Sequence, residues 1–499
     1  MNYTAQQFAE KKSNLGSVFG NMGCEDTMDL FAEMSDSAQT GQSSTMRAIC
    51  DAMDTSAFAA KEDGSHALSG GDGRTWVYTV FNSASLPRKD IAVLTLWDYG
   101  DGSKKLSVTD ERGTHLPFEL VEKEPVGDSN HTLAHLNVLV TVPAMGWTTV
   151  VVKETSLRHS FMVDSDGAQA QKQRSNVVLE NIHLRAEFDA RSGALLSLTD
   201  KETGIEQLDG PAGLFVVLAE RKTNSMRRVS RHFKAIPVEN TISLRTNGLK
   251  LCPGFEMEQK IFSSRIRTCV TLEGDARELH YTFDVDWNEA SGNGDTVPVL
   301  AFRAPVAESA EELLCDIPVG SVVHHPQPVD HKCKAFAAAL GEGFAPALMS
   351  DAECGCRLDD HVLSCTLINF SEAPGSYQAR DLHNIHLWLS SSNGNPVVLQ
   401  RRAEALANPL TVMPAGAHRG NLPTEVSLLS VKSSSSMLFG VETDQEGGIL
   451  VRVYEMQGRA DHVTLELPFA PKSADCGVIR DHTVCFDIAP YGLAEVRIS

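Results

Sequence analysis

A two-residue alternation of apolar and polar side chains recurs along most of the chain after residue 75, and it limits what the chain can fold into. The clearest example is ELHYTFDVDW (278–287), whose apolar members are Leu279, Tyr281, Phe283, Val285 and Trp287. Successive side chains of a β-strand point to opposite faces of the sheet. The pattern therefore predicts a strand with one buried face and one wet face.

The same alternation opens a longer stretch, VLENIHLRAEFDARSGALLSLTDKETG (178–204). RSG follows the first run as a turn, and ALLSLTD returns toward a second turn at KETG. Glycine and polar clusters between such runs are typical of hairpin turns. The segment is predicted to be a β-hairpin or meander, with these residues on its buried face: Ile182, Leu184, Ala186 and Phe188.

Other runs rich in β-branched and aromatic residues follow, separated by turn sequences. They include TWVYTVFN (75–82), DIAVLTLW (90–97), LNVLVTVPAMGWTTVVVKE (136–154) and GILVRVYE (448–455). After residue 60 only RRAEALA (401–407) resembles a helix. Runs of strands without alternating helices favour antiparallel sandwiches. The predicted fold class is mainly β, with several antiparallel β-sandwich domains after a short N-terminal helical segment.

Composition and spacing divide the chain into five ranges. Met46, Ile49 and Met53 recur at helical spacing, and the glycine-rich segment KEDGSHALSGGDGR follows them. A stretch rich in Pro and Gly marks a last boundary. The predicted ranges are a helical segment at 1–60, a linker at 61–74, a small β-sandwich at 75–160, a large sandwich at 175–395 and a C-terminal β-sandwich at 408–499.

Charge and cysteine content exclude some partners and favour one compartment. The formal net charge is −21, which repels a phosphate polymer, so no nucleic acid partner is expected. No apolar run approaches the roughly 20 residues that span a bilayer, so no membrane partner is expected. The eleven cysteines form no repeated C-x-x-C pair, and the N-terminus lacks an apolar signal region. We therefore expect free thiols and a cytoplasmic location.

Asp284 and Asp286 are a candidate carboxylate pair. Residues two apart on a strand share a face and lie roughly 6.5–7 Å apart, a separation that glycosidase chemistry permits. Catalytic carboxylates usually converge from different elements, with unequal surroundings that separate their pKa values. Two carboxylates on one solvent-exposed strand face are more typical of a solvated pair, so no catalytic residue is assigned.

The stretch VVHHPQPVDH (322–331) holds three histidines. His324 and His325 are adjacent, so on a strand they point to opposite faces and do not share one metal. A turn through the two prolines would gather His325, Asp330 and His331. Ordinary surface or capped histidines are the stronger interpretation, and no metal ligand is assigned.

The cysteines of the same region pose a similar question. Cys354 and Cys356 flank a glycine and share a strand face, while Cys333 and Cys365 lie elsewhere in sequence. A zinc site is expected to use a second tight pair, which the sequence lacks, so buried thiols are the favoured interpretation. DSDG (164–167) begins like a calcium loop, but its twelfth position is Ser175 rather than Glu, so it is discarded.

Tryptophans are the candidate sugar contacts. Trp97, Trp147 and Trp287 lie in strand-like runs and are predicted to be core residues. Trp76 and Trp388 remain as candidates for exposed aromatic contacts with a carbohydrate.

Seven segments in order resemble the C-terminal half of glycoside hydrolase family 38, the α-mannosidases. They are VFNSASLPR (80–88), residues 179–204, FEMEQKIF (255–262), VDWNE (285–289), DIPVGSVVH (316–324), LMSDAECG (348–355) and GGILVRVYEMQG (447–458). STMRAICDAMDTSAFA (44–59) resembles the last helix of the family's central bundle. The resemblance implies β-sandwich modules that include a large galactose-mutarotase-like supersandwich, with residues 1–60 as a bundle remnant.

The resemblance also implies what the catalytic part contains. Intact members are retaining mannosidases whose N-terminal barrel holds a zinc ion and an Asp nucleophile. Sixty residues are too few for that barrel, and the first histidine of the chain is His66. No zinc ligand, nucleophile or other cofactor site is therefore carried over, and zinc is expected in the barrel alone.

These expectations leave three hypotheses. The first is a non-catalytic companion or scaffold for a separately encoded barrel, inactive alone in mannoside and glycan breakdown, with an exposed surface that binds the barrel or associates with itself. The second is a stand-alone carbohydrate-binding β-sandwich protein. The third is an inert truncated product.

Overall fold

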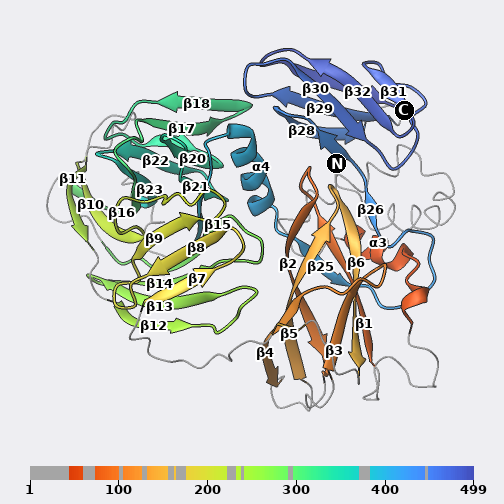
Figure 1. The fold of residues 1–499 in the computed structure, drawn as a ribbon, viewed down its shortest axis with the longest axis horizontal. Coiled ribbons are helices and arrows are strands. Elements are labelled where there is room, and N and C mark those ends of the chain that lie inside the picture. The colour runs from red at the N-terminus through yellow and green to blue at the C-terminus, as the bar shows by residue number, and fades with distance from the viewer. Residues whose placement is uncertain are drawn as a thin grey trace. The chain divides into compact units, whose positions relative to one another are not determined.

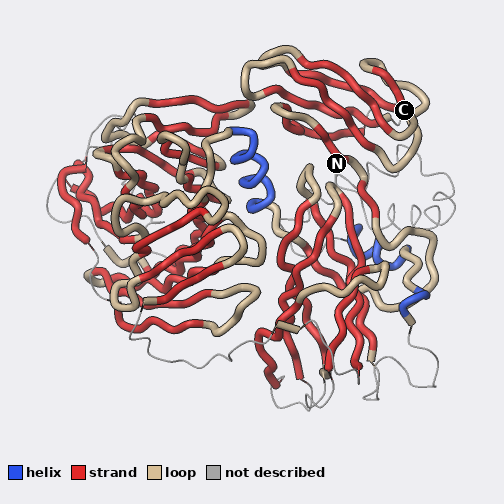
Figure 2. The backbone as a smooth tube through the Cα atoms, viewed as in Figure 1, coloured by secondary structure: helices blue, strands red, loops and turns tan. Residues whose placement is uncertain are grey.

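The computed structural model confirms a mainly β fold built from antiparallel sheets. It describes residues 44–59, 74–99, 105–125, 132–155, 162–163, 176–221, 232–237, 241–289, 296–369, 382–443 and 448–499. Two compact units divide the chain: unit 1 comprises residues 1–165 and 408–499, and unit 2 comprises residues 166–407. Figure 1 labels the elements, and Figure 2 shows how strands dominate both units. The five domain ranges proposed from the sequence stay predictions.

The first sandwich of unit 1 packs a five-stranded sheet against a three-stranded one. The larger sheet contains β1 (Thr75–Asn82), β3 (Lys105–Asp110), β6 (Gly146–Thr155), β25 (Thr411–Pro414) and β26 (Val426–Ser427). The smaller contains β2 (Arg88–Trp97), β4 (Phe118–Pro125) and β5 (Thr132–Val142). Their facing side chains, such as Leu94, Leu136 and Val150, form one buried core. Strands that are far apart in the sequence therefore build this sandwich.

The second sandwich of unit 1 follows β26 along the chain. Its four-stranded sheet contains β27 (Ser430–Lys432), β30 (Asp461–Glu466), β31 (Val478–Arg480) and β32 (Thr483–Ile488). Its three-stranded sheet contains β28 (Ser436–Thr443), β29 (Ile449–Glu455) and β33 (Leu493–Ile498). Val451, Val463 and Val496 are fully buried between the sheets.

Helix α3 (Ser44–Ala52) contacts β25 of the first sandwich, and its buried side chains join a cluster that also includes the core of the second sandwich. A short 3-10 turn, η2 (Ser56–Phe58), follows the helix. Met46 and Ile49 are each 1% exposed, and burying such a side chain contributes about 1.5–3 kcal/mol. Met53 forms a parallel bridge with Leu422. The predicted helical segment is thus present over residues 44–52, whereas its part at 1–43 and nearly all of the linker lie outside the described residues.

Unit 2 is a large sandwich of two sheets and a smaller third sheet. The nine-stranded sheet contains β12 (Thr241–Thr246), β13 (Gly254–Ile261), β14 (Ser264–Thr271), β15 (Glu278–Asp286), β17 (Glu312–Ile317), β18 (Gly320–His324), β20 (Phe336–Leu340), β21 (Ala347–Ser350) and β24 (Leu382–Ser390). The six-stranded sheet contains β10 (Leu214–Arg221), β11 (His232–Pro237), β16 (Thr296–Pro305), β19 (His331–Cys333), β22 (Cys354–Asp359) and β23 (Val362–Asn369). The alternation predicted for 278–287 is confirmed, because its five apolar side chains are at most 1% exposed.

The 178–204 stretch forms the third sheet of unit 2, from β7 (Val177–Glu180), β8 (Leu184–Phe188) and β9 (Leu195–Asp200). The predicted meander is therefore confirmed. Phe188 is fully buried and packs edge-on against Phe255 of β13 at 4.8 Å between ring centroids. Ile182 was expected on the buried face but is 63% exposed, because it lies in the connection before β8 begins.

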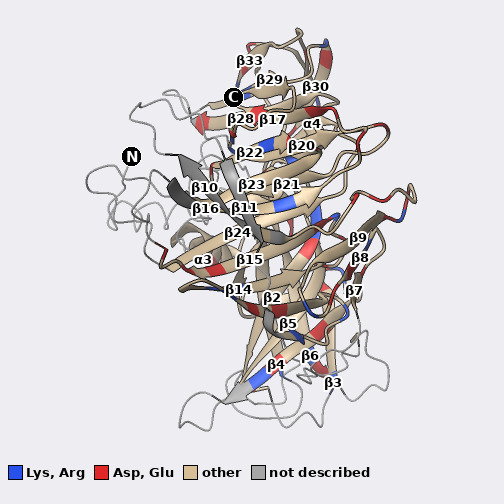
Figure 3. Cartoon of the chain, turned by 90° about the vertical axis from the view of Figure 1, so that its left-hand side faces the viewer, with Lys and Arg blue, Asp and Glu red and all other residues tan. Residues whose placement is uncertain are grey.

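Helix α4 (Pro396–Ala407) confirms the one late helix expected from the sequence. Leu399 and Ala403 pack against Trp388, Phe336 and other side chains of the nine-stranded sheet. None of the helices that the structure describes is long and apolar enough to cross a bilayer. In the described part of the chain, Lys and Arg are interspersed with Asp and Glu rather than gathered on one element (Figure 3).

Candidate functional site

A cavity of about 390 Å³ opens at the edge of the first sandwich, wholly within unit 1. Strands β1 and β25 supply one side, and the edge strand β2 supplies the other. Three aromatic side chains line it: Trp76 and Tyr78 from β1, and Trp97 from the end of β2. Ligand sites of this size are typically apolar with a few polar groups that fix orientation.

The polar residues that line the cavity include Thr95 of β2, Arg74 just before β1 and Asp98 just after β2. The Tyr78 hydroxyl donates a 2.7 Å hydrogen bond to the Thr95 carbonyl, and burial raises the pKa of Tyr78. The Arg74 guanidinium donates to the Asp98 carbonyl, and Asp98 has a left-handed backbone with φ of 56°. These bonds hold β1 and β2 together while leaving aromatic faces to form the wall.

Trp97 is the residue that sequence reasoning missed. It was predicted to be a core residue, but it is 55% exposed. Strand β2 buries Leu94 and Leu96, so Val93 and Trp97 point the other way. The alternation through DIAVLTLW places Trp97 on the face opposite Leu94 and Leu96. Because both faces of this run carry apolar residues, the sequence does not show which face is exposed.

The other tryptophans divide as follows. Trp147 and Trp287 are fully buried, as predicted. Trp76 is half-buried at the cavity. Trp388 was a candidate for exposure, but it is only 7% exposed, because helix α4 covers it and His280 stacks on it at 4.5 Å.

Asp284 and Asp286 lie on the exposed face of β15, as the alternation predicts. Asp284 accepts a 2.7 Å hydrogen bond from Asn384, and Asp286 accepts one of 2.9 Å from Asn288. The register places Arg267 opposite Asp284 and Arg265 opposite Asp286 on the neighbouring strand. Nothing in this arrangement gives the two carboxylates the unequal surroundings that acid–base chemistry uses.

The histidines of 322–331 meet differently from the arrangement considered above. His324 stacks on His331 with ring centroids 3.6 Å apart, whereas His325 is exposed. Burial, then the neighbouring His324, lowers the pKa of His331. Asp330 turns toward Arg357, 3.2 Å away, and accepts a 2.8 Å hydrogen bond from a threonine hydroxyl. The group of His325, Asp330 and His331 is therefore not assembled.

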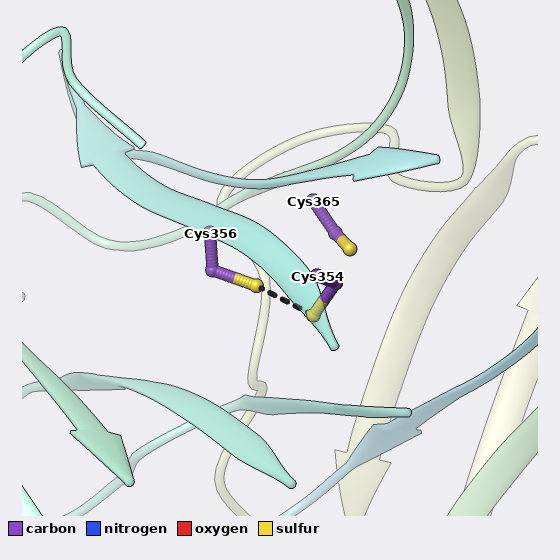
Figure 4. A group of neighbouring side chains, drawn as sticks. All are labelled: Cys354, Cys356 and Cys365. Carbon is purple, nitrogen blue, oxygen red and sulfur yellow. Dashed lines mark hydrogen bonds between the residues drawn. The ribbon is translucent and has the colours of Figure 1, made fainter. Parts of the chain in front are cut away.

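The cysteines of this region do come together. The sulfur atoms of Cys354, Cys356 and Cys365 all lie within 4.8 Å of one another (Figure 4). Cys333 lies beside Cys354 and Cys356 in the same core. The expectation that these thiols are buried holds for three of them, and Cys354 is half-buried. The calcium-like segment at 164–167 lies outside the described residues.

Comparison with known proteins identifies the fold. No protein-family model and no curated protein matches the sequence. Two solved structures match over 91% of this chain, each at 14% identity: a protein in the glycosyl hydrolase family 38 from Enterococcus faecalis, with a TM-score of 0.69, and an alpha-mannosidase from Enterococcus faecalis V583, with a TM-score of 0.66. The chain spans 60% and 58% of their respective lengths.

At this level of identity the likeness establishes fold. The fold that the sequence resemblance implied is therefore confirmed: the chain is built like part of these larger glycoside hydrolase structures.

Proposed function

We propose that residues 1–499 are the non-catalytic β-sandwich part of an α-mannosidase-like glycoside hydrolase, acting in mannoside and glycan breakdown. In this role they support a catalytic barrel supplied outside these residues. The observation that carries the proposal is the match to two family 38 structures over 91% of this chain but only about 60% of theirs. Fold alone does not fix function, so this shared framework supports an architectural role and no activity of its own.

The chemistry of the described residues supports a scaffold rather than a hydrolytic centre. A retaining glycosidase needs two carboxyl groups about 5–5.5 Å apart on either side of the bond that it cleaves. Asp284 and Asp286 share one exposed strand face and are hydrogen-bonded by asparagines. No catalytic role is therefore proposed for them.

The zinc ion that the family resemblance implies does not fit the donor groups described. A sugar-binding zinc needs an open coordination position next to a cleft. The three neighbouring thiols lie in or at the edge of the core of unit 2, and His324 and His331 stack on each other rather than facing a common point. We derive no catalytic step through that metal in this chain.

Immunodepletion tests the scaffold role. A lysate of cells that naturally express the chain is depleted with an antibody against it, and aryl α-mannosidase activity is measured in both fractions. The proposal predicts that activity leaves the supernatant and appears with the bound chain. Activity that stays entirely in the supernatant contradicts the proposal. Native mass spectrometry of the bound fraction distinguishes a complex with a barrel protein from self-association of the chain.

A cytoplasmic location belongs to the same proposal. All ten cysteines among the described residues are free thiols, several of them close enough to meet. Free neighbouring thiols persist in a reducing compartment. Fractionation of the native cells tests this, and recovery of the chain in a secreted fraction contradicts it.

A second candidate function is carbohydrate binding at the cavity of unit 1. Trp76 and Trp97 offer apolar ring faces, and Trp97 is 55% exposed beside polar groups. Aromatic rings with a polar tip suit ligands that have both apolar and hydroxyl surfaces. This combination is the observation that favours a sugar ligand.

Fluorescence titration tests this second function. Methyl α-mannoside is added to the purified chain, and tryptophan emission is followed. Binding at the cavity predicts a saturable change that Trp97→Ala abolishes and Tyr491→Ala, an exposed aromatic control in the same unit, preserves. An unchanged titration in Trp97→Ala, or no saturable change in the parent chain, rejects the cavity as a mannoside site.

A further inference from the structure

Half of the cysteines that the structure describes gather at one place. Ten cysteines are described, and five of them lie together in unit 2. We call these five the thiol cluster: Cys315, Cys333, Cys354, Cys356 and Cys365. Packing alone gives no reason for so many thiols to meet, since any small apolar side chain fills such space.

Strand register creates the thiol cluster. Cys333 of β19 lies opposite Cys354 of β22, and Cys356 of β22 lies opposite Cys365 of β23. Directly opposed residues, and residues two apart on one strand, share a face of the sheet. Three neighbouring strands therefore present four cysteines to the same side, toward the core of unit 2.

A glycine on the other face of the sheet accompanies this arrangement. Gly355 lies between two of the cysteines, and a Cβ there would approach the Asp330 carboxylate at 3.1 Å. Asp330 also contacts Arg357 and Thr366, so it joins the loop before β19 to β22 and β23. These contacts tie the three strands together on the face opposite the thiol cluster.

The spacing of the sulfur atoms suits a tetrahedral metal ion. The Cys354 and Cys356 sulfurs are 3.6 Å apart, and the Cys365 sulfur lies within 4.8 Å of both. A tetrahedral zinc site with Zn–S bonds of about 2.3 Å places its sulfurs about 3.8 Å apart. Shifts of roughly 1 Å or less would bring the three sulfurs to that spacing.

Zinc is bound by thiolate rather than by thiol. The ion would therefore displace the protons of the cysteines that ligate it.

We propose that the thiol cluster binds one Zn²⁺ ion, which joins three neighbouring strands of the six-stranded sheet. The ligands are Cys354, Cys356, Cys365 and Cys333. Thiolate ligands select soft or borderline cations, and four thiolates on one centre are typical of structural zinc. Half-buried Cys354 gives the ion a route in from the surface.

Cys333 is a better fourth ligand than the nearby histidine. His331 lies opposite Cys356 in the register, but its Nε2 is 2.9 Å from Gln327 and its ring stacks on His324. Cys333 is fully buried and within hydrogen-bonding reach of Cys356, and its sulfur would move to complete the group of three sulfurs that lie within 4.8 Å of one another. Cys315 lies on β17 of the nine-stranded sheet and forms a side-chain hydrogen bond with Cys333. It therefore acts as a positioning residue for Cys333 and not as a ligand.

The site differs from a catalytic zinc centre. All four positions of the ion are filled by protein sulfur, so no position is left for water or substrate. Its role is to stabilise unit 2, and this role does not depend on whether the scaffold function is correct.

Metal content and protection from alkylation test the proposal on the full chain. The protein is purified under reducing conditions with Zn²⁺ and then desalted, and its zinc content is measured by mass spectrometry. One Zn²⁺ per chain is expected. Iodoacetamide labelling, mapped by peptide mass spectrometry, should spare Cys354 with zinc present and modify it after chelation, while exposed Cys269 is labelled in both.

Variants locate the ion. Cys354→Ser and Cys365→Ser should lose the bound zinc, and Cys333→Ser should bind it more weakly. The matched control Cys269→Ser, in the same unit but outside the thiol cluster, should keep it. Circular dichroism verifies the fold of each variant, and the labelling result on the parent chain stands even where a variant does not fold.

Four results overturn the proposal. The first is a parent chain without stoichiometric zinc, and the second is zinc that stays bound after Cys354 or Cys365 is replaced. The third is labelling of Cys354 that is the same with and without zinc. The fourth is a disulfide within the thiol cluster of freshly reduced and isolated protein. Preferential binding of Cu⁺ over Zn²⁺ under the same conditions also overturns the assignment of the metal.

Discussion

Ser391 donates a 2.7 Å hydrogen bond to the carboxylate of Asp200, a residue 191 positions earlier in the chain. Asp200 closes the meander of β7, β8 and β9, and Ser391 follows the central strand β24. The same carboxylate accepts hydrogen bonds from the backbone amides of Glu202 and Thr203. Burial opposes its ionisation, but these hydrogen bonds outweigh burial and lower the pKa of Asp200. The meander is thereby fastened to the large sandwich, as a structural element should be.

Replacing Asp200 tests this attachment. Asp200→Ala leaves the Ser391 hydroxyl and two amides without their partner, so the free energy of unfolding should fall by about 1–3 kcal/mol. Urea denaturation followed by circular dichroism measures the change. The control is Asp209→Ala, an exposed aspartate nearby, which should stay within about 0.5 kcal/mol of the parent. Equal effects of the two substitutions contradict the assignment.

Asp461 gives unit 1 an acid-sensitive contact. Its carboxylate accepts hydrogen bonds from Ser434, Ser435 and Ser436, which outweigh burial and hold its pKa well below the usual range. A depressed carboxylate pKa contributes stability above the unfolded-state value of about 3.9, and this stability is lost as pH falls further. Asp461→Ala should therefore destabilise the chain at pH 7 and progressively less toward pH 2.

Urea midpoints at pH 7, 5 and 3 measure the Asp461 effect. The exposed residue Asp481 supplies the control, because Asp481→Asn keeps a side chain that tolerates its left-handed backbone. If the difference in urea midpoint between the parent chain and Asp461→Ala stays constant with pH, the charge of the Asp461 carboxylate does not contribute to stability.

Two glycines of unit 1 make opposite predictions. A Cβ on Gly420 would overlap the carbonyl oxygens of Ala52 and Met53, whereas one on Gly440 would meet nothing within 4 Å. Gly420→Ala should cost about 1–3 kcal/mol by forcing helix α3 away from the sandwich. Gly440→Ala should be neutral or stabilise by up to about 1 kcal/mol. Thermal unfolding of both variants decides, and a neutral Gly420→Ala argues against the docking of α3.

Trp97 and Trp388 test which aromatic side chains are structural. Trp388→Ala removes a buried ring under helix α4 and should lower the free energy of unfolding by about 3–5 kcal/mol. Trp97→Ala removes an exposed ring and should change it by less than about 1 kcal/mol. Chemical denaturation of the pair checks this, and the reverse order refutes the exposures described here.

The sequence predicts strands better than it predicts what covers them. The alternation through Tyr281 and Phe283 identified a buried face correctly, because that face and the polar face differ sharply in β15. In β2 both faces are apolar, so the exposure of Trp97 was hidden. Trp388 was misjudged because the helix that covers it lies later in the chain and packs through tertiary contacts that a single sequence does not reveal.

The thiol cluster depends on register, which the sequence alone does not specify here. Cys354 and Cys356 were recognised as sharing a face, but Cys333 and Cys365 join them only because β19, β22 and β23 pair as they do. The expected second tight pair in sequence is replaced by two single cysteines from flanking strands. A search for metal sites by sequence spacing misses such an arrangement.

The most direct test of the scaffold proposal is turnover of an aryl α-mannoside by purified residues 1–499 with Zn²⁺ present. The proposal predicts no release of the aryl group above the buffer blank over hours. Sustained release by the chain alone, reduced by Asp284→Asn or Asp286→Asn, would place a hydrolytic centre on the sandwiches and contradict it.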